Sequence, residues 1–272
     1  MSSSTETIPP PGGLLRSPRA TGTPLESPRS RSWRLEGAST EAPFDAAPST
    51  AIAGDEVATL VDSPPLSRRT EWWNTLTHGG GAVLSAVGLL AIVARLAATG
   101  ATAGTWAAGL LYGGTLLYLY AASGLSHWYS WRLDPVRRAF WRRQDQVGIL
   151  LMSAGSMAPL AVHAEGAGRL VFPVLTVAVT ILLVALLRHD RVTIPPLWLA
   201  QLGWLPPLAA ADILRVGGTT GGLLALGGGA CYIGGLLFLM NDGRRWWMHP
   251  LWHLTVLFGS GLHYLFLLTY CL

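Results

Sequence analysis

The chain has 272 residues, of which 50% are hydrophobic and only 12% are charged. Soluble domains carry roughly 25% charged residues, so this composition excludes an ordinary soluble domain and indicates an integral membrane protein. All 19 basic residues are arginine, and without a lysine to form a Schiff base the chain is not a retinal pigment. Its two cysteines are too few for a disulfide framework or a cysteine metal cluster.

The first 70 residues are rich in Pro, Ser, Thr and Gly and show no sustained apolar period. A segment of this composition buries too little apolar surface to fold. We therefore expect a disordered cytoplasmic tail over residues 1–70 and a membrane domain over residues 71–272.

Seven apolar runs follow the tail, and several approach the roughly 20 residues that a helix needs to cross a bilayer. They cover residues 75–98, 106–126, 147–162, 170–187, 197–214, 223–240 and 252–272. These runs predict an all-α fold, a bundle of seven transmembrane helices. Pro159 interrupts the third run and Pro206 and Pro207 the fifth, whereas glycines at 227–229 and 234–235 predict close helix contacts in the sixth.

Arginines are unequally distributed between the two sides of this predicted bundle. Three lie on one side, namely Arg95, Arg169 and Arg215. The opposite side holds 11: Arg68, Arg69, Arg132, Arg137, Arg138, Arg142, Arg143, Arg188, Arg191, Arg244 and Arg245. The positive-inside rule then predicts a cytoplasmic N-terminus and a C-terminus on the opposite side of a multi-pass protein, which we expect in the plasma membrane. The arginines between 132 and 143 predict contact with anionic lipid headgroups, with no nucleic acid as partner.

Polar residues inside the apolar runs gather at the predicted cytoplasmic ends. His249 and His253 open the last run, and their spacing of four places both rings on one helix face. His127 ends the second run, with Ser123 one turn earlier, and Asp145 lies at the start of the third. Ionisable groups at membrane depth are costly, so we interpret this group as a functional site.

Three imidazoles and a carboxylate are a typical donor set for zinc. His127, His249 and His253 would be the nitrogen ligands, leaving a fourth position for water with Asp145 nearby. The residues alone leave an alternative open, a hydrogen-bonded polar network that locks helix packing. Pro250 disfavours helical geometry at the residue before it, which predicts His249 at the helix cap and Pro250 as the first helical residue.

A polar stripe also opens the first run, where Glu71, Asn74, Thr77 and His78 are spaced by three and four residues. We expect Glu71, Asn74 and His78 to lie outside the ligands and support them. For His78 we expect hydrogen bonds to this surrounding layer, in preference to ligation of the metal.

Several motifs in this chain have the form of a known family's motifs. They are Glu71-x-x-Asn74-x-x-Thr77-His78-x-x-Gly81, Ser123-x-x-x-His127, Asp145 followed by Ala154-Gly155-x-x-x-Pro159, Gly229-x-x-Tyr232-x-x-Gly235, and His249-x-x-Trp252-His253 with His263. Over residues 71–272 the chain resembles the progestin and adipoQ receptor family, whose bacterial branch is called hemolysin III. It departs from the family pattern at Gln146, where a histidine usually follows the aspartate.

The resemblance implies a seven-helix bundle that holds zinc through His127, His249 and His253. It also implies that Asp145 reaches the metal through water and that Ser123 lies beside the site. The wider superfamily includes alkaline ceramidases. We therefore expect a metal-dependent hydrolase of lipid amides, with a ceramide-like substrate taken from the surrounding membrane lipids and cleaved at the cytoplasmic side.

Other classes of function remain as alternatives. A receptor or sensor would use zinc structurally, to clamp helices together. A transporter needs a continuous polar path, but the far half of the predicted bundle has acidic residues only near loops, at Glu165 and Asp212. A pore-forming hemolysin needs an amphipathic segment, which the sequence does not show. The sequence does not choose between a monomer and a homo-oligomer.

Overall fold

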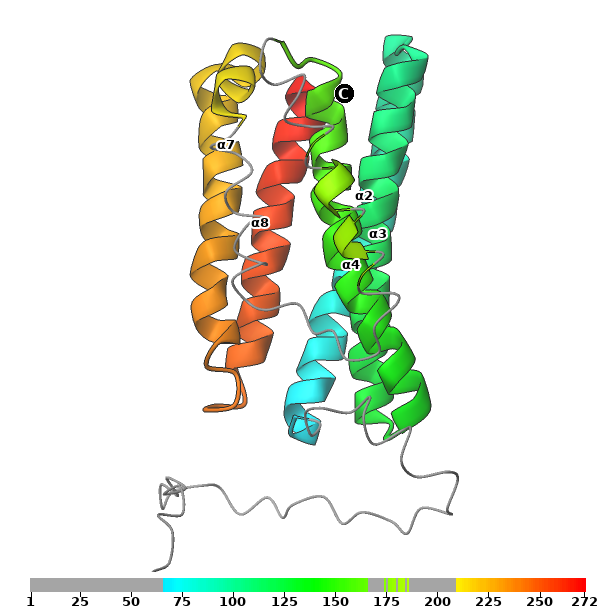
Figure 1. The fold of residues 1–272 in the computed structure, drawn as a ribbon, viewed down its shortest axis with the longest axis vertical. Coiled ribbons are helices and arrows are strands. Elements are labelled where there is room, and N and C mark those ends of the chain that lie inside the picture. The colour runs from blue at the N-terminus through cyan, green and yellow to red at the C-terminus, as the bar shows by residue number, and fades with distance from the viewer. Residues whose placement is uncertain (1–65, 166–173, 175, 180, 184, 186–208) are drawn as a thin grey trace, which may run out of the picture. The chain divides into compact units, whose positions relative to one another are not determined.

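The computed structural model describes residues 66–165, 174, 176–179, 181–183, 185 and 209–272. The long helices in these residues are α2 (Arg68–Thr99), α3 (Ala103–Trp131), α4 (Pro135–Ala161), α7 (Ala210–Leu239) and α8 (Met248–Tyr270). Helix α3 packs against both α2 and α4, α7 packs against α8, and α8 also contacts α2 (Figure 1). The described part of the chain contains no strand, which confirms the all-α prediction.

Local capping residues fix where the first three helices begin. Ser67, Thr102 and Asp134 precede α2, α3 and α4, and each side chain accepts a hydrogen bond from the backbone N–H three residues later. Such caps satisfy N–H groups that the first helical turn leaves free. Pro135 follows its cap at the first helical position, where its fixed φ favours the helix.

Several predicted boundaries were wrong. Helix α4 begins at Pro135, well before the predicted run of 147–162, because its first turns carry arginines that a search for apolar runs discards. Helix α2 begins at Arg68, three residues before the predicted start of the membrane domain at 71. The fourth and fifth predicted spans, 170–187 and 197–214, lie mainly outside the described residues, as does the tail up to residue 65.

Helix α7 consists of two helices that meet at Gly218. The fifth span was expected to end at 214 and the sixth to begin at 223, and the break at Gly218 falls between these positions. There the backbone has φ 59° and ψ −157°, a conformation that glycine adopts at little cost. The predicted loop is therefore a kink at one glycine.

The polarity of α2 is the reverse of that in a soluble protein. Val83 and Leu84 are 66% and 69% exposed, whereas Glu71 and Asn74 are 3% and 0% exposed. An apolar outer face around a polar interior is typical of a helix surrounded by lipid. Three helices in the described residues, α2, α7 and α8, are long and apolar enough to cross a membrane. The chain is thus an integral membrane protein, while the count of seven spans stays a prediction.

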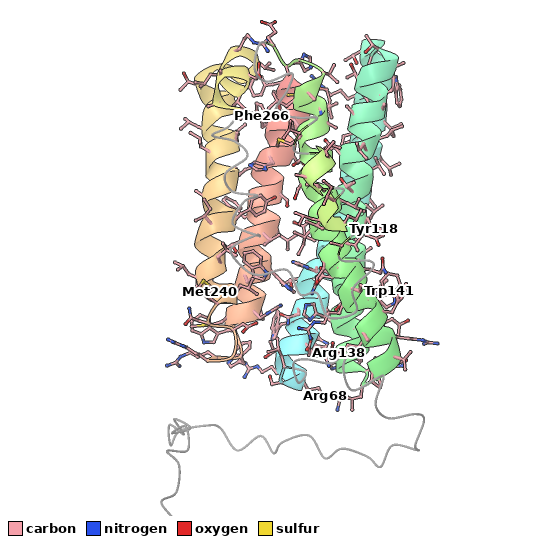
Figure 2. All side chains as sticks on the ribbon, in the orientation of Figure 1. Arg68, Tyr118, Arg138, Trp141, Met240 and Phe266 are labelled. Carbon is pink, nitrogen blue, oxygen red and sulfur yellow. The ribbon has the colours of Figure 1, made fainter. Side chains whose placement is uncertain are left out.

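Apolar and polar interiors occupy opposite ends of the bundle. Figure 2 shows Phe266, a member of the apolar core, near one end, and Arg68 and Arg138 near the other. The core also contains Ile92, Leu96, Tyr112, Leu116, Leu160 and Leu267. The predicted site residues lie toward the arginine end, and its assignment to the cytoplasm stays a prediction.

Close contact between α3 and α4 depends on Gly148. A Cβ added there would lie 2.9 Å from the Leu119 Cα, too close for the backbone to accommodate without moving. We expect Gly148→Ala to destabilise the protein by about 1–3 kcal/mol through overpacking, measured as a lower Tm in detergent. Gly114→Ala on α3 is the matched control, because a Cβ there meets nothing within 4 Å. An equal fall in Tm for both variants would contradict this account.

Candidate metal centre

His127 on α3 lies beside His249 and His253 on α8. The centroids of the three rings are 5.2, 4.9 and 4.7 Å apart. One nitrogen from each ring lies within 4.8 Å of the other two. His253 and His127 are only 2% and 9% exposed. The structure therefore brings the three predicted histidines together, and in this arrangement they could hold a metal ion.

Carboxylates orient two of these rings through hydrogen bonds to Nδ1. The Nδ1 atom of His127 lies 2.6 Å from the Glu71 Oε2, and that of His249 lies 2.9 Å from the Asp242 Oδ2. A carboxylate accepts, so Nδ1 carries the hydrogen in both rings and Nε2 keeps its lone pair for a metal. A carboxylate that accepts a hydrogen bond from the other ring nitrogen is a common support of a histidine that binds a metal. The Asn74 amide also lies against His127, 3.4 Å from Nδ1.

A hydroxyl group has the same effect on the third ring. The Thr77 Oγ1 lies 3.1 Å from the His253 Nδ1. Its own hydrogen is directed to backbone carbonyl oxygens of α2 at 2.9 and 3.0 Å, so Oγ1 accepts from the ring. The Nε2 of His253 therefore also carries no hydrogen and keeps its lone pair for a metal. All three histidines thus have Nδ1 fixed and Nε2 available.

His78 on α2 contacts two other aromatic rings. Its ring stacks on His253, with centroids 3.5 Å apart and planes 18° apart, and it meets the Tyr120 ring edge-on. Neither ring nitrogen has a hydrogen-bond partner among the described residues. The hydrogen-bonding role expected for His78 therefore stays a prediction. The close approach of α2 to α8 places the two rings face to face, and His78 packs against the ligand.

Asp145 and Ser123 form a pair beside the histidines. The Ser123 side chain lies near the Asp145 carboxylate, which is close enough to His127 to interact with it electrostatically. Asp145 does not belong to the group of mutually close ligand atoms. Both residues line the same cavity as the three histidines. This arrangement is compatible with contact between Asp145 and a metal through an intervening water.

Two local features were missed or misplaced by the sequence analysis. Asp242, the partner of His249, lies in the connection before α8, where an acidic residue looks like an ordinary solvated one. Its only signal is an acidic side chain seven residues before the first histidine of the pair. His249 was expected at the helix cap, but α8 begins at Met248. Pro250 is tolerated in this first turn because its missing N–H would have no helical partner.

The histidines open onto a cavity of about 460 Å³. That volume is within the usual range for small-molecule sites. Its polar wall lies around the three histidines, and much of the remaining wall is apolar: Leu119, Ile149, Met152, Met157, Leu239, Trp252 and Val256. Three imidazole nitrogens with an adjoining cavity suit a divalent transition metal that keeps one position open.

The fold and the site together define an all-α integral membrane protein with a candidate three-histidine metal centre. Comparison with known proteins agrees with this class. Residues 66–264 match the Haemolysin-III related family. The chain is also 29% identical over 203 residues to Hemolysin-3 from Bacillus cereus, an alignment that covers 73% of this chain and 90% of that protein. No solved structure matches the chain. The chain therefore belongs to the Haemolysin-III related family.

Glu71 offers a test of the support behind the ligands. In Glu71→Gln the amide holds the His127 Nδ1–H less strongly than the carboxylate does. We expect zinc affinity to fall about 10- to 100-fold, measured by competition with a chromophoric chelator. Glu165→Gln is the matched control, because that side chain is 64% exposed and pairs with Arg215. Unchanged affinity in Glu71→Gln would show that the carboxylate does not support the metal.

Proposed function

We propose that this protein is a zinc-dependent hydrolase of lipid amide bonds that acts at the cytoplasmic side of the membrane. One observation carries the proposal. Three histidines with Nδ1 fixed lie beside the Asp145–Ser123 pair, on the wall of a largely apolar cavity. The three histidines suit a metal ion, the Asp145–Ser123 pair suits proton transfer, and the apolar cavity suits a lipid.

Zinc supplies Lewis-acid chemistry in such a site, because it polarises a carbonyl group and acidifies water. Asp145 acts as the general base: its carboxylate orients the attacking water, takes its proton and delivers that proton to the departing amine. Ser123 keeps the carboxylate in position. Because it lies beside that carboxylate, we assign Ser123 the role of a positioning residue.

The cavity favours a lipid as the substrate. Met152 and Val256 on its wall are buried apolar residues that can contact an acyl chain. The exposed faces of the helices are apolar too, so a substrate dissolved in the bilayer can approach from the side. A long-chain amide of the ceramide type combines such a chain with a bond that zinc and Asp145 can hydrolyse.

Hydrolysis of defined substrates tests the proposal. Purified zinc-loaded protein in detergent is incubated with ceramides of several acyl lengths, and released fatty acid is measured by mass spectrometry. We expect release that disappears when a chelator removes zinc and returns when zinc is added back. Zinc-loaded protein that releases no fatty acid from any ceramide or other lipid amide would refute the proposal.

A sensor with structural zinc is the second candidate. It is favoured by the number of helices that contribute residues to the centre. The ligands come from α3 and α8, and Glu71 and Thr77 add α2, so one ion would join three helices. Bound zinc without turnover would be the expected result in that case. A transporter is not favoured, because the far-side acids Glu165 and Asp212 both pair with Arg215, at 3.1 and 2.6 Å.

A further inference from the structure

His263 is a buried histidine in the wall of the cavity, apart from the three histidines of the candidate metal centre. It lies on α8, ten residues beyond His253, and is 8% exposed. Its Nε2 lies 2.9 Å from the carbonyl oxygen of Ala225 on α7. A carbonyl oxygen only accepts, so Nε2 carries the hydrogen and Nδ1 keeps a lone pair. This Nδ1 has no partner among the described residues and retains accessible surface.

The direction of that lone pair is fixed by α7. Gly228 leaves room for the ring, since a Cβ added there would overlap the Cδ2 and Nε2 of His263. Tyr232, one helical turn further along α7, meets the ring edge-on with centroids 5.4 Å apart. The His263 ring packs against the backbone at Gly228, hydrogen-bonds Ala225 and contacts the Tyr232 ring, so it has little freedom to rotate. The cavity therefore has a fixed hydrogen-bond acceptor at its deeper end.

Tyr232, whose ring contacts His263, adds a second polar side chain to this end of the cavity. Its side chain also lines the cavity, and its OH lies 2.8 Å from the Ser260 Oγ. The deeper end is thus polar, while Val256, between His253 and His263 on α8, lines the cavity with apolar surface. The cavity thus has polar groups at both ends, and α8 contributes apolar surface between them.

We propose that His263 and Tyr232 form a second polar subsite, which binds a hydroxyl group on the chain of an amphiphile whose head is held at the metal centre. Ten helical residues span about 15 Å. An extended chain covers about 1.2 Å per bond, so the hydroxyl lies about twelve bonds from the head. The ligand class is a hydroxylated acyl chain. This inference rests on the proposed function in one respect only, namely that a metal ion at the three histidines binds the polar head of the amphiphile.

Binding of simple acids tests the subsite without any turnover. Dissociation constants are measured by calorimetry on zinc-loaded protein for dodecanoic, 12-hydroxydodecanoic and 12-methoxydodecanoic acid. The hydroxyl can donate to the His263 Nδ1, whereas the methyl ether cannot. We expect the hydroxy acid to bind about tenfold more tightly than the methoxy acid, because an unpaired buried polar group costs about 1–3 kcal/mol. This comparison needs no protein variant.

Variants of His263 then assign the effect. In His263→Leu we expect the preference for the hydroxy over the methoxy acid to disappear, with the affinity for dodecanoic acid retained. His263→Gln should keep the preference, because its amide nitrogen can donate to Ala225 while its oxygen accepts from the ligand. Octanoic and 8-hydroxyoctanoic acid are the length control. Their affinity ratio should be the same in the parent protein and in His263→Leu, because the shorter chain does not reach.

Each contrary result overturns the subsite. Equal affinity for the hydroxy and methoxy acids, the same preference in His263→Leu as in the parent, or no binding of any of these acids would do so. Failure of the proposed function is distinguishable from this. If the protein shows the His263-dependent preference but hydrolyses no amide, the subsite stands and the proposed hydrolase activity is refuted. If it hydrolyses amides without this preference, the hydrolase activity stands and the subsite is refuted.

Discussion

Replacement of His253 by alanine is expected to release the metal. His253 is one of three histidines whose nitrogens could hold a metal ion and is 2% exposed, so no solvent-exposed side chain can take its place without rearrangement. Its loss also leaves the Thr77 oxygen without the ring N–H that it accepts. We expect zinc affinity to fall by more than about a hundredfold, beyond the loss expected for a supporting residue. The measurement is zinc content per chain by mass spectrometry after dialysis against a chelator.

The control for His253→Ala is another histidine at a distance from the centre. His163 follows the end of α4 and bonds the Cys271 carbonyl oxygen at 3.0 Å. His163→Ala should keep its zinc. Zinc binding stabilises the folded state by linkage, so added zinc should also raise the Tm of the parent and of His163→Ala, but not that of His253→Ala. Full zinc content in both His253→Ala and His127→Ala would contradict the three-histidine centre.

Replacement of Asp145 by asparagine is expected to separate metal binding from catalysis. Asparagine has nearly the same shape, but its amide does not accept a proton from water. Asp145 lies outside the group of mutually close ligand atoms, so zinc should be retained. We expect ceramide hydrolysis to fall about 10²- to 10⁴-fold, the usual contribution of a general base. The measurement is the initial rate of fatty-acid release, with zinc content determined on the same sample.

Asp134→Asn is the matched control for this change. Asp134 is the N-cap of the same helix, and asparagine caps a helix equally well, so both rate and zinc content should stay at the parental values. Ser123→Ala should show a smaller loss of rate than Asp145→Asn, because the carboxylate remains. Loss of zinc in Asp145→Asn would instead make this carboxylate part of the metal's support.

Periodicity and charge predicted the main parts of the site. The spacing of four between His249 and His253 is enough to place both rings on one helix face. The arginine distribution then assigned His127 to the same end of the bundle, since only the depth of each residue was needed. The buried stripe through Glu71, Asn74 and His78 also follows from spacing alone, and the structure confirms it.

Contacts between helices were beyond such arguments. The stacking of His78 on His253 depends on how closely α2 approaches α8, which no spacing within one helix specifies. The partnership of Asp242 with His249 depends on the path of the connection between α7 and α8. The length of α4 was underestimated because its arginine-rich start is helical without being apolar. In each case tertiary packing decided what the local pattern left undefined.

The pairing of Thr77 with His253 has a consequence for the order of events during synthesis. The two residues are 176 positions apart. A chain emerges N-terminus first, so α2 and α3 reach the membrane while α8 is still untranslated. Until then His127 is the only one of the three histidines present. The three histidines of the candidate metal centre therefore come together only at the end of synthesis, and a chain truncated before Met248 lacks two of them however well its remaining helices insert.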